Sequence, residues 1–255
     1  MATAPRIMPQ LSLILPAYNA ASLLEKHLPA LLTHLASLPL QCEVLVVDDG
    51  SNDAGATRLI AEKFKVEYIA LPANAGKGAA VRAGMLAATG DVRLFTDADI
   101  PYALSSLAQF YEQIAHHGFD IAIGDRTLPE SDYFKDIPLH RQLGSRVFSL
   151  IAGQFFLGSK FDTQCGIKAF RADVAEDLFT VSRINRFALD VELLYIALLR
   201  SYRIKKLPVQ LRIWEEAGLN VLKDGFAMLR DILSILYNRA RGRYQPVNTT
   251  IPRNS

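Results

Sequence analysis

Strand-length apolar runs alternate with helix-length segments along the first half of this chain. The runs occupy residues 11–15, 43–47, 66–71, 92–96 and 120–124, and helical patterns lie near 23–35, 53–64, 77–88 and 103–117. This alternation is typical of a mostly parallel sheet wrapped by helices. The sequence therefore predicts an α/β fold that binds ligands at the carboxyl ends of its strands.

Polar residues follow four of these apolar runs. The four segments are Pro16-Ala17-Tyr18-Asn19, Asp48-Asp49-Gly50-Ser51, Asp97-Ala98-Asp99 and Gly124-Asp125-Arg126. Because the carboxyl ends of parallel strands meet at the same edge of a sheet, we expect these segments to lie together.

Asp97 and Asp99 end the fourth strand with two carboxylates spaced i, i+2. On an extended backbone both side chains point the same way. Two such carboxylates can hold Mg²⁺ or Mn²⁺, and the cation can bridge a diphosphate. An Asp-x-Asp pair is also ordinary turn chemistry.

A glycine-rich segment, Asn74-Ala75-Gly76-Lys77-Gly78, begins the helix near 77–88, with Arg82 following. A Walker loop needs Ser or Thr where Gly78 stands, and the dinucleotide fingerprint needs a third glycine where Val81 stands. Neither motif is therefore present. A cationic helix N-terminus would suit a nucleotide or its phosphates, and the alternative is a plain glycine-rich helix start.

The second half of the chain predicts a different pattern. We expect a loop over 128–138, helices over 139–157, 172–179 and 188–201, a strand over 204–213, and a last helix over 221–238. The last helix is expected to place one apolar stripe on a single face: Leu222, Phe226, Leu229, Ile232, Leu233 and Leu236. We divide the chain into a first half (1–126), a second half that contains an amphipathic helix (127–243) and a flexible tail (244–255).

Charge is distributed unevenly around a net value of +2. Residues 1–125 hold 8 Lys and Arg against 13 Asp and Glu, whereas residues 126–255 hold 20 against 13. An acidic first half suits metal contacts, and a basic second half suits an anionic acceptor or a membrane surface. Halves of a chain also differ by a few charges without consequence.

Several classes of protein are disfavoured. Two cysteines make no disulfide framework, and no run reaches the roughly 18 apolar residues of a membrane span. The basic residues do not interleave with aromatic ones, so nucleic acid is not an expected partner. We expect a cytoplasmic protein, with peripheral contact at the cytoplasmic membrane face. The apolar faces at 143–157 and 221–236 are expected to be core, or in part to touch a bilayer with Arg239, Arg241 and Arg243.

The motifs of the first half, in this order, resemble those of the family-two inverting glycosyltransferases of GT-A fold. The second half adds Gly124-Asp-Arg126, Arg141-x3-Ser145, Asp162-Thr-Gln164-Cys-Gly-Ile-Lys168, Phe187-x2-Asp190-Val-Glu192 and Trp214-x-Glu216. These resemble the dolichyl-phosphate glucosyltransferase branch. The resemblance covers residues 11–235 and implies a donor nucleotide-sugar, UDP-glucose, and a polyprenyl phosphate acceptor.

The resemblance makes 1–126 the nucleotide-sugar-binding half and 127–243 the acceptor-binding half, and it also implies roles for individual residues. The donor would be bound by Pro16, Tyr18, Asp48, Asn74, Lys77, Gly78, Arg82 and Asp97. Asp97 and Asp99 would hold Mg²⁺ or Mn²⁺. The acceptor would be bound by Arg126, Arg141, Ser145, Asp162, Gln164 and Lys168. Asp99, Arg126 and Asp190 are the candidate catalytic residues.

One departure concerns the nucleoside pocket. The family has a glutamate directly after Pro-x-Tyr-Asn, whereas this chain has Ala20-Ala21. Either Glu25 substitutes from one turn on, or base selection is looser.

The acceptor chemistry leaves alternatives open. A phosphate monoester, with a second pKa of about 6, is largely ionised at pH 7 and needs no general base. A hydroxyl acceptor would need a carboxylate base, for which Asp190 is the first candidate. Asp190 can equally be an acid stabilised by a helix N-terminus. A third possibility is a nucleotide-sugar-binding protein without catalysis.

Overall fold

The computed structural model describes residues 9–132, 162–163, 165–186, 188–212 and 221–245, with no side chains described for 221–229. In chain order the elements are β1 (Leu11–Ala17), α1 (Ala21–Ser37), β2 (Cys42–Asp48), α2 (Ala56–Lys63), β3 (Glu67–Ala70), α3 (Lys77–Ala87), β4 (Val92–Phe95), α4 (Ser105–Ala115), β5 (Ile121–Gly124), β6 (Lys168–Arg171), α6 (Ala172–Val181), α7 (Leu189–Leu199), β7 (Ile204–Leu207) and α8 (Val221–Ala240).

The predicted α/β fold is confirmed. Seven strands form one sheet in the order β3-β2-β1-β4-β6-β5-β7. All neighbouring strands pair in parallel except β6, which runs antiparallel to both β4 and β5. The carboxyl ends of β1, β2, β4 and β5 therefore share one edge of the sheet, as expected.

Strand β6 was not predicted, and it positions part of this edge. It lies between β4 and β5, with Lys168 opposite both Phe95 and Ile123. Because β6 runs against its neighbours, its first residue meets their carboxyl ends. Lys168 thus joins the polar edge from the second half of the chain. Because this four-residue strand begins with Lys168 and ends with Arg171, no apolar pattern marks it in the sequence.

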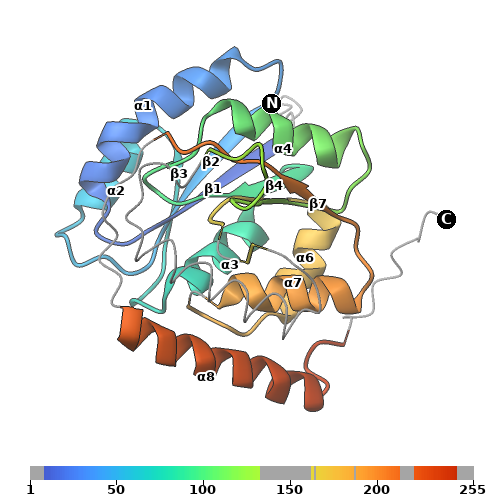
Figure 1. Cartoon of the computed structure of the whole chain (residues 1–255). Helices are drawn as coiled ribbons and strands as arrows, with labels where there is room; N and C mark the ends of the chain where they lie inside the picture. The colour runs from blue at the N-terminus through green and yellow to red at the C-terminus, as the bar shows by residue number, and fades with distance from the viewer. Residues whose placement is uncertain (1–8, 133–161, 164, 187, 213–220, 246–255) are drawn as a thin grey trace, which may run out of the picture.

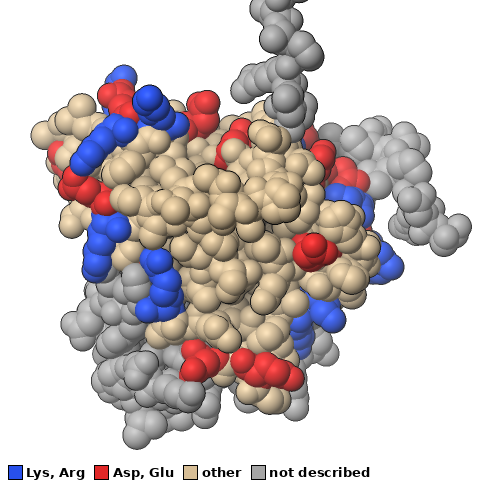
Figure 2. Space-filling view, turned by 90° about the horizontal axis from the view of Figure 1, so that it is seen from above, with Lys and Arg blue, Asp and Glu red and all other residues tan. Residues whose placement is uncertain are grey.

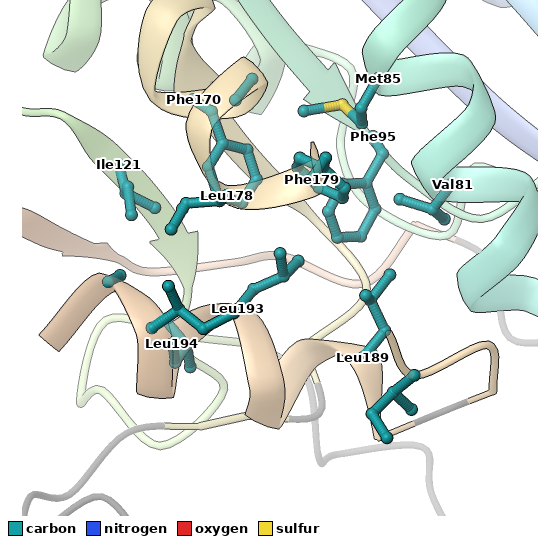
Figure 3. Close-up of a cluster of buried hydrophobic side chains, with 14 of the residues drawn as sticks. Val81, Met85, Phe95, Ile121, Phe170, Leu178, Phe179, Leu189, Leu193 and Leu194 are labelled. Carbon is teal, nitrogen blue, oxygen red and sulfur yellow. The ribbon is translucent and has the colours of Figure 1, made fainter. Parts of the chain in front are cut away.

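Helices cover both faces of the sheet (Figure 1). Helices α1, α2 and α4 pack on one face, and α3, α6 and α7 pack on the other. Figure 3 shows the core on this second face, where side chains of α3, α6 and α7 meet those of β4, β5 and β6. Phe170 stacks with Phe95 at 6.2 Å between ring centroids and meets Phe179 edge-on at 5.4 Å. Such aromatic pairs fix the sheet edge to its helices.

Helix α8 lies outermost, beyond α7 (Figure 1). Its residues Ile232 and Ile235 are buried, whereas Leu233, Leu236 and Tyr237 are 58%, 44% and 51% exposed. The prediction of a single apolar stripe that includes both Ile232 and Leu233 is therefore wrong. Adjacent residues on a helix point about 100° apart, so Ile232 packs inward while Leu233 faces outward.

The ordered chain continues past the predicted start of the flexible tail at 244. Tyr244 is buried, and its hydroxyl donates to Glu192 Oε1 at 2.6 Å. The predicted tail therefore begins too early, and residues 246–255 lie outside the described residues. The halves predicted at residue 126 contribute strands to one common sheet, because β6 and β7 join the strands of the first half.

The surface carries charges of both signs. Figure 2 views the molecule from above the helices α1 and α4, and basic and acidic side chains lie mainly around the margin of a largely uncharged centre. Within the described ranges, no helix combines the length and apolarity needed to cross a membrane.

Candidate active site

The ends of β1 and β2 are tied together by hydrogen bonds. Asp48 is buried and accepts bonds from the backbone N and the hydroxyl of Ser51 and, at 2.6 Å, from the hydroxyl of Tyr68. The Ser51 hydroxyl in turn accepts the Asn19 backbone N–H at 2.7 Å. Tyr18 is 46% exposed beside this junction, and its predicted contact with the donor stays a prediction. Pro16, two residues before Tyr18, is half-buried.

The next residue, Asp49, was not predicted as a site residue. It is buried, and its two carboxylate oxygens accept the backbone N–H groups of Ala75 and Gly76, each at 2.8 Å. Asp49 thus holds the loop that leads into Lys77, with Asn74 exposed at its start. The tandem acids after β2 were visible in the sequence, but only the fold shows that the second one anchors another loop.

The N-terminus of α3 is covered by residues 184–186. A Cβ on Gly76 would lie 2.5 Å from the carbonyl oxygen of Asn185, and one on Gly78 would lie 2.8 Å from that of Arg186. The backbone N–H of Ala79 donates to the same Asn185 carbonyl at 3.1 Å. Close packing therefore explains both glycines, and a phosphate contact at Gly78 stays a prediction.

Arg82 is held by the same segment. Its guanidinium donates to the Ser182 hydroxyl, the Asn185 side-chain oxygen and the Ile184 carbonyl at 2.9, 2.8 and 2.6 Å. The structure thus gives Arg82 a role in joining α3 to the segment before α7. Its predicted contact with the nucleotide is not tested by this geometry.

Asp97 and Asp99 lie in a turn, not on an extended strand. Strand β4 ends at Phe95, and the Ile100 backbone N–H donates to the Asp97 carbonyl at 2.9 Å. The expectation that both carboxylates continue the strand is therefore wrong, and the turn chemistry considered for Asp-x-Asp is what forms. Ile100 has φ of +45°, a strained value for a β-branched residue.

Lys77 brings a positive charge into contact with this turn. It forms an ion pair with Asp97, whose other oxygen lies against Gly166. Burial alone would lower the pKa of Lys77, but the charges of Asp97, Asp190 and Asp99 together raise it. Lys77 is therefore protonated at neutral pH, and the start of α3 faces the acidic turn as a fixed positive charge.

A second ion pair lies beside the first. Lys168 is fully buried, and its Nζ lies 2.7 Å from Asp190 Oδ1 and 2.7 Å from the Cys165 carbonyl oxygen. The ammonium also lies over the Phe95 ring, at 5.7 Å from its centroid. The negative charge of Asp190 also interacts with Lys77. Acidic and basic side chains therefore alternate at the sheet edge, in a cluster made of Asp97, Asp99, Lys77, Asp190 and Lys168.

The turn that contains Asp97 and Asp99 suits a metal ion whose remaining ligands are water and substrate phosphates. Among the described residues no three His, Cys, Asp or Glu side chains converge as a complete metal site. Mg²⁺ is commonly held by one or two carboxylates together with water and substrate phosphates, and carboxylates suit Mn²⁺ as well. Asp97 and Asp99 supply this donor set.

Arg126 is paired with Asp162 across the two halves of the chain. Its Nε and Nη2 donate to the two carboxylate oxygens at 2.6 and 2.7 Å, and its backbone N–H adds a third bond at 3.0 Å. Burial would raise the pKa of Asp162, but the Arg126 guanidinium and backbone bond hold it below the usual range. The predicted acceptor residues Arg126 and Asp162 are therefore brought together, as a buried bidentate pair.

The remaining predicted positions are placed as follows. Arg141, Ser145 and Gln164 lie outside the described residues, as do Trp214 and Glu216 and the expected helix over 139–157. Glu25 forms an exposed ion pair with Lys63 at 2.7 Å, so its carboxylate is turned toward α2. Burial raises the pKa of the Cys165 thiol to about 11, which leaves it unreactive at neutral pH.

Glu192 organises the segment that covers α3. It is fully buried and accepts the backbone N–H groups of Arg183 and Ile184 at 2.8–2.9 Å and the Tyr244 hydroxyl at 2.6 Å. Burial raises the pKa of Glu192 in spite of these bonds. Glu192 lies two residues after Asp190 in the sequence, but its burial and its hydrogen-bond partners were not predictable.

Comparison with known proteins identifies a family. Residues 12–179 match the family model described as glycosyl transferase family 2. A dolichyl-phosphate β-glucosyltransferase of Drosophila melanogaster is 38% identical over 210 residues, which are 74% of this chain and 62% of the relative. The human dolichyl-phosphate β-glucosyltransferase is 31% identical over 91% of this chain and 75% of the relative. The chain thus spans less than two thirds of the length of the fly relative.

Solved structures share the fold. Glucosyl-3-phosphoglycerate synthase from Mycobacterium tuberculosis, in complex with UDP, superposes with a TM-score of 0.67 at 19% identity, covering 91% of this chain and 80% of that chain. The same enzyme with Mn²⁺, UDP and phosphoglyceric acid gives a TM-score of 0.66 at 19% identity, over 91% and 78% of the two chains.

Proposed function

The chain belongs to glycosyl transferase family 2, and from that premise we propose that it transfers glucose from UDP-glucose to a polyprenyl phosphate, with inversion. The observation that carries this proposal is the similarity to dolichyl-phosphate β-glucosyltransferases over most of the chain. The cations at the sheet edge, Lys77 and Arg126, support it, because both the donor and the acceptor carry phosphate.

The donor half of the reaction needs its diphosphate leaving group neutralised. Asp97 and Asp99 would hold Mg²⁺ or Mn²⁺, which when bound supplies positive charge to the diphosphate. Lys77 supplies a second positive charge from the protein itself, and its raised pKa keeps it available at neutral pH. Crystals of the mycobacterial structural neighbour contain Mn²⁺ and UDP, which is consistent with this assignment.

The acceptor half needs a nucleophile that is held in place. A phosphate monoester is already ionised at neutral pH, so the protein needs cations and no general base. Arg126 would face this phosphate, while Asp162 fixes the plane of its guanidinium through the bidentate pair. Arg141 and Ser145 remain predicted partners of the same phosphate.

A hydroxyl acceptor with Asp190 as the base is the alternative. In the structure the Asp190 carboxylate is engaged by Lys168 at 2.7 Å. A general base must instead reach the proton that it removes. The ion pair therefore favours the phosphate acceptor over the hydroxyl acceptor.

Such an acceptor is embedded in a membrane, and α8 offers a surface for peripheral contact. Its outward residues Leu233, Leu236 and Tyr237 are exposed, and the guanidinium groups of Arg241 and Arg243 lie 5.2 and 5.7 Å from the centroid of the Tyr237 ring. Apolar side chains beside arginines suit the boundary between anionic headgroups and lipid chains. The predicted position at the cytoplasmic membrane face stays a prediction.

The donor is tested by a panel. The protein is incubated with Mn²⁺, a short-chain polyprenyl phosphate and one of three donors, UDP-glucose, GDP-mannose or UDP-N-acetylglucosamine, and sugar in the lipid fraction is measured. Transfer from UDP-glucose alone is expected, and Asp97→Asn serves as the inactive control. Preferential transfer from either other donor would overturn the assignment of the sugar.

A further inference from the structure

A basic pocket lies between α8 and residues 183–186, the segment that covers the start of α3. It has a volume of about 540 Å³, and its lining includes Arg183 and Arg186 from that segment and Arg230 and Arg243 from α8 and the residues after it. Asp231 is the one acidic residue among the lining residues that the structure describes. Four guanidinium groups around one carboxylate leave the pocket strongly positive, which favours an anion.

The walls of this pocket are built from buried contacts. Glu192 holds one wall through the Arg183 and Ile184 backbone N–H groups, and it holds the other through the Tyr244 hydroxyl. Arg243 is positioned by a bond from its Nη1 to the Asn238 side-chain oxygen at 2.9 Å. A single buried carboxylate thus fixes the backbone on both sides of the pocket.

Within the described part of the chain, only one weak ion pair opposes these four positive charges. Asp231 lies 3.8 Å from Arg230 Nη2, at the limit of an ion pair, and its charge also interacts with Arg186. Arg230 is 70% exposed, so solvent and ligands reach its guanidinium. Planar guanidinium groups with several donors bind phosphate oxygens in a forked geometry.

We infer that this pocket binds a phosphate or diphosphate group at a site separate from the donor site. Ala75 also lines the pocket, so a ligand there would contact the loop that Asp49 holds. A phosphate of this kind can belong to a soluble molecule or to a lipid headgroup. The inference does not depend on the transferred sugar or on the acceptor.

The test uses the full chain with inorganic pyrophosphate as the probe, in EDTA so that no divalent cation contributes. Calorimetry compares the wild type with Arg186→Gln/Arg230→Gln, which removes one cation from each wall. The matched control, Arg58→Gln/Arg203→Gln, removes the same charge from exposed positions outside the pocket. Lys77→Met removes the cation of the donor site.

We expect at least tenfold weaker binding in Arg186→Gln/Arg230→Gln and less than twofold change in the control and in Lys77→Met. Wild-type binding that is absent, or that is lost equally in the control, overturns the inference. Loss in Lys77→Met with retention in the pocket variant also overturns it, because the probe would then occupy the donor site. Circular dichroism verifies that each variant is folded.

Binding to lipid vesicles distinguishes a lipid headgroup from a soluble phosphate as the ligand of the pocket. Phosphatidylcholine vesicles contain equal fractions of either phosphatidic acid, a phosphate monoester, or phosphatidylglycerol, a diester. Selective loss of phosphatidic acid binding in the pocket variant, relative to Arg58→Gln/Arg203→Gln, assigns the site to a headgroup. Unchanged vesicle binding together with lost pyrophosphate binding assigns it to a soluble phosphate.

Discussion

Lys168, the first residue of the antiparallel strand β6, lies with its Nζ 2.7 Å from Asp190 Oδ1 at the start of α7. This pair joins the sheet to the helix behind the site, and its members come from motifs that are more than twenty residues apart in the sequence. Both side chains are nearly or fully removed from solvent. Each charge therefore depends on the other.

Removing one member of this pair should destabilise the protein strongly. Lys168→Met or Asp190→Asn leaves a buried charge without its partner, which costs about 3–5 kcal/mol. The double variant should lose less than the sum of the two, because neither charge then remains. Urea unfolding of the four proteins measures this coupling. Additive losses would contradict the interaction, and lost activity without lost stability in Asp190→Asn would favour its role as a base.

The Arg126–Asp162 pair predicts a dependence of stability on pH. Because Arg126 holds the folded-state pKa of Asp162 below its unfolded value, the pair's contribution is fully present above about pH 4. It is lost as the pH falls through the lowered pKa. Asp162→Asn should reduce the free energy of unfolding at pH 7 and flatten its decline in acid. An unchanged acid slope in this variant would show that other carboxylates govern it.

Arg82 separates a structural role from direct nucleotide binding. Arg82→Ala removes three hydrogen bonds to residues 182–185 and should lower the free energy of unfolding by about 1–3 kcal/mol. The exposed Arg58→Ala on α2 should change it by less than about 0.5 kcal/mol. Chemical denaturation measures both variants. Unaltered stability in Arg82→Ala, with weaker UDP binding, would instead assign Arg82 to the nucleotide.

Asp97 tests the proposed metal site. Asp97→Asn should abolish the part of UDP binding that depends on Mn²⁺, since one of two carboxylates is lost. Calorimetry with UDP in Mn²⁺ and in EDTA measures that difference directly. Asp53→Asn, at a half-buried carboxylate that accepts the Thr57 backbone N–H, is the control and should retain Mn²⁺-dependent binding. Equal dependence on Mn²⁺ in both variants would place the metal elsewhere.

The outward face of α8 predicts membrane binding. Leu233→Ser/Leu236→Ser should weaken binding to vesicles of phosphatidylcholine and phosphatidylglycerol several-fold, because exposed apolar area is lost from the helix. Leu59→Ser/Leu86→Ser removes exposed leucines from other helices and should leave vesicle binding unchanged. Co-sedimentation measures both. The same loss in both variants would mean that α8 is not the contact surface.

The alternating pattern in the sequence was sufficient for the α/β fold and for the edge at which the polar residues gather. It was insufficient for β6, because this four-residue strand has only two apolar residues, Ala169 and Phe170, between Lys168 and Arg171. The strand end at Asp97 was also misjudged, since the turn depends on a strained Ile100 that no local propensity favours.

Within the site, residue types and spacing were enough to nominate Lys77, Asp97 and Arg126. They could not show that Asp162 occupies the Arg126 guanidinium or that Asp49 and Glu192 anchor loops. Those contacts join segments far apart in the chain and depend on burial, which a single sequence does not reveal. The stripe on α8 failed for a related reason, because only its packing beside α7 decides which side faces inward.

The most direct test of the proposed function compares two acceptors that differ only in their head group. The protein, UDP-glucose and Mn²⁺ are incubated with a short polyprenyl phosphate or with the corresponding polyprenol, and the lipid product is identified by mass spectrometry. The account predicts glucosyl phosphoryl polyprenol from the phosphate and no product from the alcohol. Glucose attached to the alcohol, or UDP-glucose binding without transfer to the phosphate, would contradict it.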